Sequence, residues 1–65
     1  GHLFEALTYI KKAYAASKDE EIGLHLAEVL WVCGFKAEAA KIWQELLMQK
    51  PNSEAVLKHR AQWEK

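Results

Sequence analysis

His25 and Glu28 are the first side chains in this sequence whose types and spacing could support chemistry. Three residues apart on a helix, they share one face, as in an H-x-x-E fragment of a metal site. A closed zinc site needs four ligands, and no second histidine follows at a spacing that would supply another. The other candidate ligands, His2, Cys33 and His59, belong to separate segments that would have to converge. We therefore expect a solvated polar pair and no bound metal.

Cys33 raises the question of a reactive thiol. A nucleophilic cysteine needs a histidine with an asparagine or aspartate to activate it, and no such partners stand at a recognised spacing. Cys33 also follows Leu26 by seven residues on the inward stripe of a helix, which favours a small buried hydrophobic side chain. The sequence contains no phosphate-binding loop, paired-carboxylate pattern or Ser-His-Asp motif. We expect neither catalysis nor a cofactor.

The composition is that of a small folded domain. A chain of 65 residues buries only about 60% of its unfolded surface, so modest stability is expected. Apolar residues make up 51% and charged residues 28%, which argues against disorder. Nine basic and nine acidic side chains cancel, which predicts no nucleic-acid footprint and no polybasic membrane patch. Uninterrupted apolar runs are only a few residues long, so no direct membrane insertion is expected. This window also shows no signal-peptide pattern.

The elements that must position these residues are helices. Apolar residues recur at intervals of three and four along most of the chain, the rhythm of amphipathic helices. The pattern predicts an all-α fold with helices at about 3–17, 20–33, 36–49 and 53–64. Links of only a few residues would make neighbouring helices antiparallel.

Residues with special backbone or capping chemistry separate these helices. Asp19 precedes the second helix, and Asn52 or Ser53 precedes the fourth, so their side-chain oxygens can cap the first turn. Gly34 is expected in the left-handed conformation at the end of the second helix. Pro51 ends the third helix because it pushes the preceding residue out of the α region.

The chain contains an internal repeat with a period of 33 residues (43 − 10 and 39 − 6). The matched pairs are Gly1 with Gly34, Glu5 with Glu38, Ala6 with Ala39, Ile10 with Trp43, and Ala13 with Leu46. A fixed period of this size is typical of a helical unit stacked on a copy of itself. Such arrays usually carry a binding surface and seldom a reaction centre.

The repeat resembles the tetratricopeptide family, whose signature combines Trp-x2-Leu-Gly-x2-Tyr, a turn glycine, Ala-x3-aromatic and a final proline. The matching residues here are Gly23-x2-Leu26-Ala27-x2-Leu30-x3-Gly34-x4-Ala39-x3-Trp43-x2-Leu46-x4-Pro51. Ala27 and Leu30 replace the usual glycine and tyrosine. Gly23 stands where a large tryptophan is usual, and the sequence offers no packing reason for it. A mid-helix glycine costs about 1 kcal/mol relative to alanine.

The resemblance implies a right-handed superhelix of antiparallel hairpins, a solenoid cut from a longer array. Residues 1–18 would be the second helix of a preceding repeat, residues 19–51 a complete repeat, and residues 52–65 a C-terminal capping helix. Arg60 and Glu64 fit the cap, since no further helix would cover them. The stretch from His25 to Gly34 is also similar to the last repeats of proteobacterial envelope lipoproteins that act as adaptors. A parent of that kind would lie in the bacterial periplasm or envelope; otherwise the cytoplasm is expected.

Tetratricopeptide arrays bind peptides or partner proteins on a concave face made by the first helix of each pair. The positions that map to this face are Glu21, Leu24, His25, Glu28, Trp31, Val32, Lys58, His59 and Gln62. Trp31 could be a binding anchor or a packed core residue. Leu24 and Glu28 stand where carboxylate-binding members carry lysine and asparagine, so no C-terminal carboxylate clamp is expected.

Two functions follow from this resemblance. One is a protein-interaction scaffold that uses the concave face. The other is a structural segment that caps an array or self-associates while binding occurs elsewhere. Leu3, Phe4, Leu7 and Tyr14 are expected on a side of the first helix that another helix would cover, which makes a homodimer through this helix a further expectation.

Trp43→Ala should cost about 3–5 kcal/mol, the usual range for removing a buried aromatic side chain. Trp43 occupies the aromatic position of the complete repeat, where the second, third and fourth helices are expected to meet. Because a domain of this size has little stability to lose, the variant should be largely unfolded. Thermal denaturation followed by circular dichroism measures this, and a cooperative melt close to that of the unmodified chain would contradict the core assignment.

Overall fold

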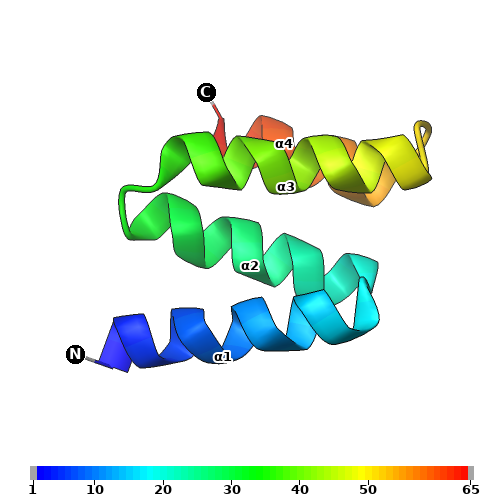
Figure 1. The fold of residues 1–65 in the computed structure, drawn as a ribbon. Helices are drawn as coiled ribbons and strands as arrows, with labels where there is room; N and C mark the ends of the chain where they lie inside the picture. Colours follow the sequence, from blue (N-terminus) through cyan, green and yellow to red (C-terminus); the bar gives the residue numbers. More distant parts are fainter. Residues whose placement is uncertain (1, 65) are drawn as a thin grey trace.

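The computed structural model describes residues 2–64, which form four helices (Figure 1). Their bounds are α1 His2–Ser17, α2 Glu20–Val32, α3 Lys36–Gln49 and α4 Glu54–Trp63. The all-α prediction is confirmed, and every predicted helix end lies within one residue of the observed one. Gly1, which the repeat pairs with Gly34, and Lys65, the last residue of the expected capping helix, lie outside the described residues. None of these helices combines the length and apolarity that crossing a bilayer requires.

Helix α2 is the centre of the fold. Successive helices run antiparallel, with α2 between α1 and α3 and with α4 behind α3 in the view of Figure 1. Helix α2 packs against α1, α3 and α4, and α3 also packs against α4. The second and fourth helices are therefore neighbours although α3 separates them in the chain.

Local capping chemistry sets the ends of α2, as the sequence predicts. The Asp19 carboxylate accepts hydrogen bonds from the backbone N–H groups of Glu21 and Ile22, at 2.8 and 3.3 Å. At the other end Gly34 has φ +92°, and its N–H donates to the carbonyl of Trp31. The N–H of Phe35 donates to the carbonyl of Leu30. This paired pattern is a Schellman motif, which requires a residue in the left-handed conformation after the helix.

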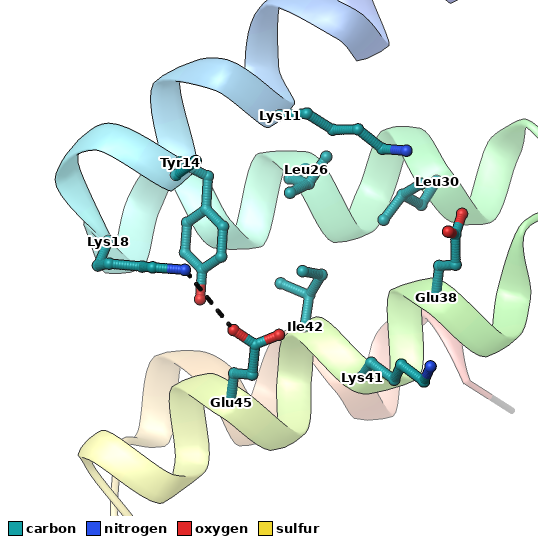
Figure 2. A pocket seen from close by; sticks show the side chains of 10 residues that line it. Lys11, Tyr14, Lys18, Leu26, Leu30, Glu38, Lys41, Ile42 and Glu45 are labelled. Carbon is teal, nitrogen blue, oxygen red and sulfur yellow. Dashed lines mark ion pairs between the residues drawn. The ribbon is translucent and has the colours of Figure 1, made fainter.

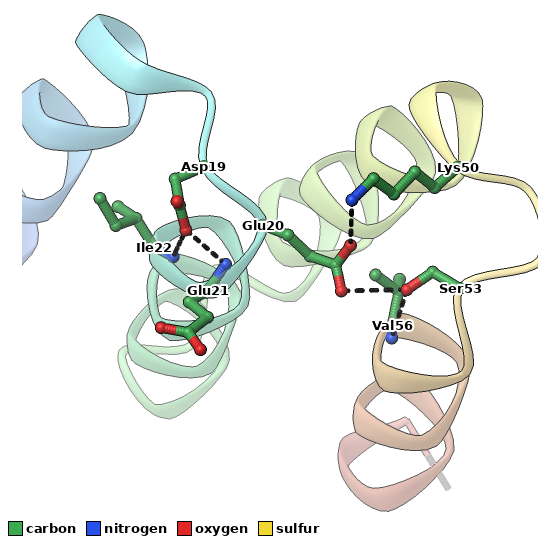
Figure 3. A network of polar contacts seen from close by, with 7 residues as sticks. All are labelled: Asp19, Glu20, Glu21, Ile22, Lys50, Ser53 and Val56. Carbon is green, nitrogen blue, oxygen red and sulfur yellow. Dashed lines mark hydrogen bonds and ion pairs between the residues drawn. The ribbon is translucent and has the colours of Figure 1, made fainter.

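The turn between α3 and α4 is attached to the start of α2 (Figure 3). The Ser53 hydroxyl accepts a hydrogen bond from the N–H of Val56 at 3.4 Å and so caps α4. The same hydroxyl donates to the Glu20 carboxylate at 3.0 Å. The Lys50 ammonium lies 3.9 Å from the other oxygen of Glu20. One side chain of α2 thus holds both sides of the turn that Pro51 begins.

A single apolar core joins the four helices. Its buried members are Leu7, Tyr14, Leu26, Ala27, Leu30, Ala39, Trp43, Leu46 and Val56. Trp43 is the largest of the fully buried side chains, and Ala27 and Ala39 are fully buried beside it in the same core. Their small side chains let the helix backbones approach closely around the indole.

Several burial expectations need correction. Leu7 and Tyr14 are buried by this chain's own helices, so they are not part of an open face of α1. Ala6 is exposed, in contrast to its repeat counterpart Ala39. Cys33 is only half-buried, because it is the residue that ends α2 and follows its last full turn. On α4, Leu57 and Ala61 are exposed, while Val56 is buried and Trp63 half-buried.

Gly23 has a packing reason that the sequence alone does not reveal. A Cβ atom at this position would lie 2.9 Å from Cε1 of Tyr14 and 3.0 Å from Cδ2 of Leu46. Side chains from α1 and α3 therefore press directly on the backbone of α2. The space that a side chain at position 23 would need is filled by side chains of the neighbouring helices.

Gly23→Ala should destabilise the chain by up to about 2 kcal/mol. Overpacking a well-filled core costs about 1–3 kcal/mol, and the better helix propensity of alanine returns about 1 kcal/mol. Chemical denaturation measures the difference. Combining Gly23→Ala with Leu46→Val should reduce its cost, because the substitution removes the Cδ atoms that the new methyl group meets.

A matched control is Gly34→Ala. Nothing lies within 4 Å of a Cβ at Gly34, so its cost arises from the left-handed backbone alone and should not depend on Leu46. An increase in stability on Gly23→Ala would contradict the close approach, since helix propensity would then be the dominant effect.

Candidate functional site: an aromatic row across α2, α3 and α4

Four aromatic side chains form a continuous row through the fold. The ring centroids of Trp31 and Trp43 are 5.7 Å apart, those of Trp43 and His59 6.0 Å, and those of His59 and Trp63 6.3 Å. All three pairs are tilted, with interplanar angles of 46°, 60° and 37°. Trp43 is fully buried, whereas Trp31, His59 and Trp63 are half-buried. The row therefore starts on α2, passes through the core on α3 and reaches the surface again on α4.

A side-chain hydrogen bond fixes the middle of this row. The indole Nε1–H of Trp43 donates to Nδ1 of His59 at 3.1 Å. A buried indole N–H needs an acceptor, and an imidazole can accept at Nδ1 only when its proton is on Nε2. His59 therefore has to be neutral, in the Nε2–H form, for α3 and α4 to stay joined in this way.

Electrostatics around His59 agree with that requirement. Burial lowers the pKa of the His59 imidazole below its ordinary value of 6.5, and the carboxylate of Glu28 opposes this shift by raising it. The effect of Glu28 also shows that a carboxylate of α2 lies within electrostatic reach of the α4 imidazole.

At the α2 end of the row, Trp31 contacts a cation. The Lys36 ammonium lies 5.1 Å from the centroid of the Trp31 ring, within the range of a cation–π interaction. Trp31 therefore combines contact with the buried Trp43 and partial exposure. Trp31 is therefore a packing residue that keeps part of its ring exposed.

The nine positions predicted for a concave face divide into two groups. Five are exposed and four are half-buried; the exposed ones are Glu21, His25, Val32, Lys58 and Gln62, and the half-buried ones are Leu24, Glu28, Trp31 and His59. Glu28, Trp31 and His59 belong to the aromatic row or its immediate electrostatic surroundings.

Glu21 and His25 lie elsewhere. They line a groove of about 380 Å³ between α1 and α2, together with Tyr9, Ile10, Ala13 and Ile22. His25 and Glu28 are therefore not brought together as one site.

Two residues of the aromatic row and its surroundings, Trp63 and Lys36, were not predicted from the sequence as site residues. The four-residue spacing of His59 and Trp63 on one helix face could have indicated the first.

A second groove, of about 300 Å³, lies on another side of α2 (Figure 2). Apolar side chains of α2 and α3 form its floor, and its rim carries charges of both signs. The Lys18 ammonium lies 3.9 Å from the Glu45 carboxylate and 4.8 Å from the centre of the Tyr14 ring. These contacts join the end of α1 to α3.

The Tyr14 phenol in this groove is not a candidate base or nucleophile. Its oxygen is buried and has no hydrogen-bond partner within residues 2–64. Burial raises the pKa of the phenol, and the nearby Glu45 carboxylate raises it further. The group is therefore protonated and unreactive at neutral pH.

The described residues show no cluster of metal ligands, and the chain has no significant match to known proteins. Within the part of the chain that the structure describes, no three histidine, cysteine, aspartate or glutamate side chains gather as metal ligands would. Comparison of the chain with protein-family models, curated proteins and solved structures gives no significant match.

The stability of the chain should fall on mild acidification. The pKa of His59 is lowered in the folded state, so below about pH 6.5 the unfolded chain takes up a proton that the folded chain resists. The loss begins near the ordinary value of 6.5 and continues until the pH reaches the lowered folded pKa. Protonation also removes the acceptor for the Trp43 indole. Melting temperatures between about pH 7.5 and pH 5.5 measure the effect.

His59→Asn is the matched control, because an asparagine oxygen can accept a hydrogen bond from the indole but does not titrate in this range. The variant should lose much of the pH dependence above about pH 5.5. An equally steep dependence in both proteins would show that another group controls it.

Proposed function

We propose that this chain is a tetratricopeptide-type protein-interaction module that binds a peptide or partner protein through the surface of α2 and α4. The observation that carries the proposal is the aromatic row, which is anchored in the core by Trp43 and partly exposed at Trp31 and Trp63. Exposed parts of tryptophan side chains on a rigid support are frequent centres of binding energy. We call this surface the α2–α4 face; it comprises Glu28, Trp31, Lys58, His59, Gln62 and Trp63.

The order of helix contacts supports this assignment. In a stack of helix pairs whose binding surface is formed by the first helix of each pair, the first helices of successive pairs must be neighbours. Helix α2 packs on α4 as well as on α3, and Glu20 and Ser53 at their N-terminal ends are hydrogen bonded. The repeat pattern in the sequence, with Gly34 at the turn and Trp43 in the core, is consistent with the same architecture.

The chemistry of the α2–α4 face indicates which ligand it suits. Glu28 places a half-buried carboxylate beside the aromatic row, which favours a basic side chain and disfavours a free C-terminal carboxylate. Trp31 and Trp63 offer apolar ring surface for an aliphatic or aromatic anchor. Lys58 belongs to the same face and the Lys36 ammonium lies over Trp31, so a basic side chain is favoured only at Glu28 itself. The preferred ligand is therefore an internal peptide segment in which lysine or arginine reaches Glu28 and a neighbouring apolar residue contacts the tryptophans.

A structural role is the alternative function, and one observation favours it. Three apolar side chains of α1 are strongly exposed, with 46% exposure for Leu3, 60% for Phe4 and 75% for Tyr9. On α4, Arg60 and Glu64 form an ion pair at 3.2 Å, as suits a helix whose outer side faces solvent. In this alternative the chain would cap a longer array or associate with another copy, and the partner protein would bind to other repeats.

Selection from a random-peptide phage library tests the proposed function. Peptides that bind the chain should be rich in apolar residues next to lysine or arginine. Trp31→Ala should weaken the selected peptides by about tenfold or more, the loss expected for an interface hot spot. Lys41→Ala is the matched control because Lys41 is exposed on α3 and lines the other groove. This control should bind the peptides as the unmodified chain does.

Folding of each variant is checked by its thermal melt, because Trp31 also contacts Trp43. A second substitution, Glu28→Gln, removes the carboxylate with little change of shape and should weaken the basic peptides selectively. Peptides that bind Trp31→Ala and Glu28→Gln unchanged, or that are lost on Lys41→Ala, would show that the α2–α4 face is not the binding surface.

A further inference from the structure

The internal repeat places two grooves of the molecule in correspondence. Helices α1 and α3 match with an offset of 33 residues, so Ile10 corresponds to Trp43. Helices α2 and α4 match with an offset of 34 residues (53 − 19), because the capping residues Asp19 and Ser53 occupy the same place before each helix. The groove between α1 and α2 is therefore the counterpart of the groove between α3 and α4.

These two grooves differ in what covers them. Helix α2 packs on both α3 and α4, and Ala39, Trp43 and Val56 in that groove are fully buried. Their counterparts between α1 and α2 are exposed or half-buried: Ala6 is exposed, and Ile10 and Ile22 are half-buried. The α1–α2 groove measures about 380 Å³, and Tyr9 at its edge is 75% exposed. Its lining thus corresponds by sequence to that of a groove that a helix covers in this fold.

We infer that a second copy of this chain covers the α1–α2 groove, with the two α1 helices packed antiparallel about a two-fold axis near Tyr9. Small residues make such close packing possible, because Ala6 and Ala13 are seven residues apart and so share one side of α1. In an antiparallel pair centred near residue 9, Ala6 of each copy lies close to Ala13 of the other. The same side chains then meet from both copies, as a two-fold interface requires.

Charge complementarity is the argument for a second copy over an unrelated helix. Glu5 and Lys12 are exposed and lie beside the alanine stripe, also seven residues apart. The midpoint of Ala6 and Ala13 is position 9.5 and that of Glu5 and Lys12 is position 8.5, so with the alanines opposite each other the charged groups are displaced by about 3 Å along the helix axis, a distance that their long side chains can span. An antiparallel partner therefore brings each Glu5 within reach of Lys12 of the other copy, twice in one interface. Within residues 2–64 of one copy, the ion pair of Glu5 is an exposed contact with His2 at 3.8 Å, which contributes little.

Helix α2 extends the same interface. Ile22 and His25 line the groove, and Val29 and Val32 follow each of them by seven residues on the same side of the helix. Leu3, which is 46% exposed, precedes Ile10 by seven residues on α1. Two α1–α2 hairpins then pack as layers of a four-helix arrangement. Glu28 of the α2–α4 face lies four residues before Val32 on the same side of α2 and so borders this contact. The inference itself rests on α1 and the α1–α2 groove and does not use the proposed function.

The interface is small, because α1 has 16 residues and spans only about 24 Å. Contacts of this size belong to the low end of specific interfaces, so we expect a reversible dimer with micromolar affinity. Sedimentation equilibrium of the chain over a range of concentrations should show a monomer–dimer equilibrium. A strict monomer at high micromolar concentration would overturn the inference.

Substitutions locate the surface. Ala6→Glu should abolish the dimer and leave the fold intact, since Ala6 is exposed in the monomer. Ala15→Glu is the matched control, because Ala15 is also exposed on α1 but lines the opposite groove. Glu5→Lys and Lys12→Glu should each weaken the dimer several-fold, and the two together should restore it. A dimer that survives Ala6→Glu, or a double variant no better than the single ones, would contradict this packing.

Cross-linking tests the axis directly in a Cys33→Ser background, which removes the native thiol. Tyr9→Cys should oxidise readily to a disulfide-linked dimer, since the same residue from both copies meets at the two-fold axis. Thr8→Cys, one residue away but about a quarter turn around the helix, should not cross-link at a comparable rate. Equal cross-linking of both variants would place the contact on another surface.

Discussion

Burial of the Trp43 indole is the constraint on which the rest of this structure depends. A side chain of that size, fully enclosed in a chain of 65 residues, needs three helices around it and small residues where the helices approach. Ala27 and Ala39 meet the second need, because both are fully buried in the same core. The polar edge of the indole imposes a further condition, since its N–H must find an acceptor. His59 is that acceptor, and the bond specifies how α4 lies against α3.

The α2–α4 face is supported by this core. Trp31 on one side of Trp43 and His59 with Trp63 on the other continue the ring contacts outward, so the exposed aromatic edges rest on a rigid base. The link from Glu20 to Ser53 and Lys50 aligns the starts of α2 and α4 at the other end of the same helices. Stability and the proposed binding surface therefore share one set of contacts. Changes at Trp31 affect both, which is why binding has to be measured together with folding.

Local chemistry made the helices and their ends predictable, whereas contacts among three helices were not. Asp19, Gly34 and Pro51 act through backbone and capping effects within a few residues, so their roles could be assigned from the sequence. Gly23 could not be explained in this way, because Tyr14 and Leu46 fill its space from two other helices. Of the positions that the family resemblance assigned to a face, Glu28, Trp31 and His59 lie near one another in the structure. His25 lies in a different groove, since α1 packs beside it.

The state of the Trp43 indole tests this account most directly. A proton–nitrogen correlation spectrum at neutral pH resolves the indole N–H groups of the three tryptophans. The account predicts that the Trp43 signal exchanges with solvent far more slowly than those of Trp31 and Trp63, and that the His59 ring carries its proton on Nε2. Rapid exchange of the Trp43 indole, or a proton on Nδ1 of His59, would contradict the buried hydrogen bond that organises the fold and its α2–α4 face.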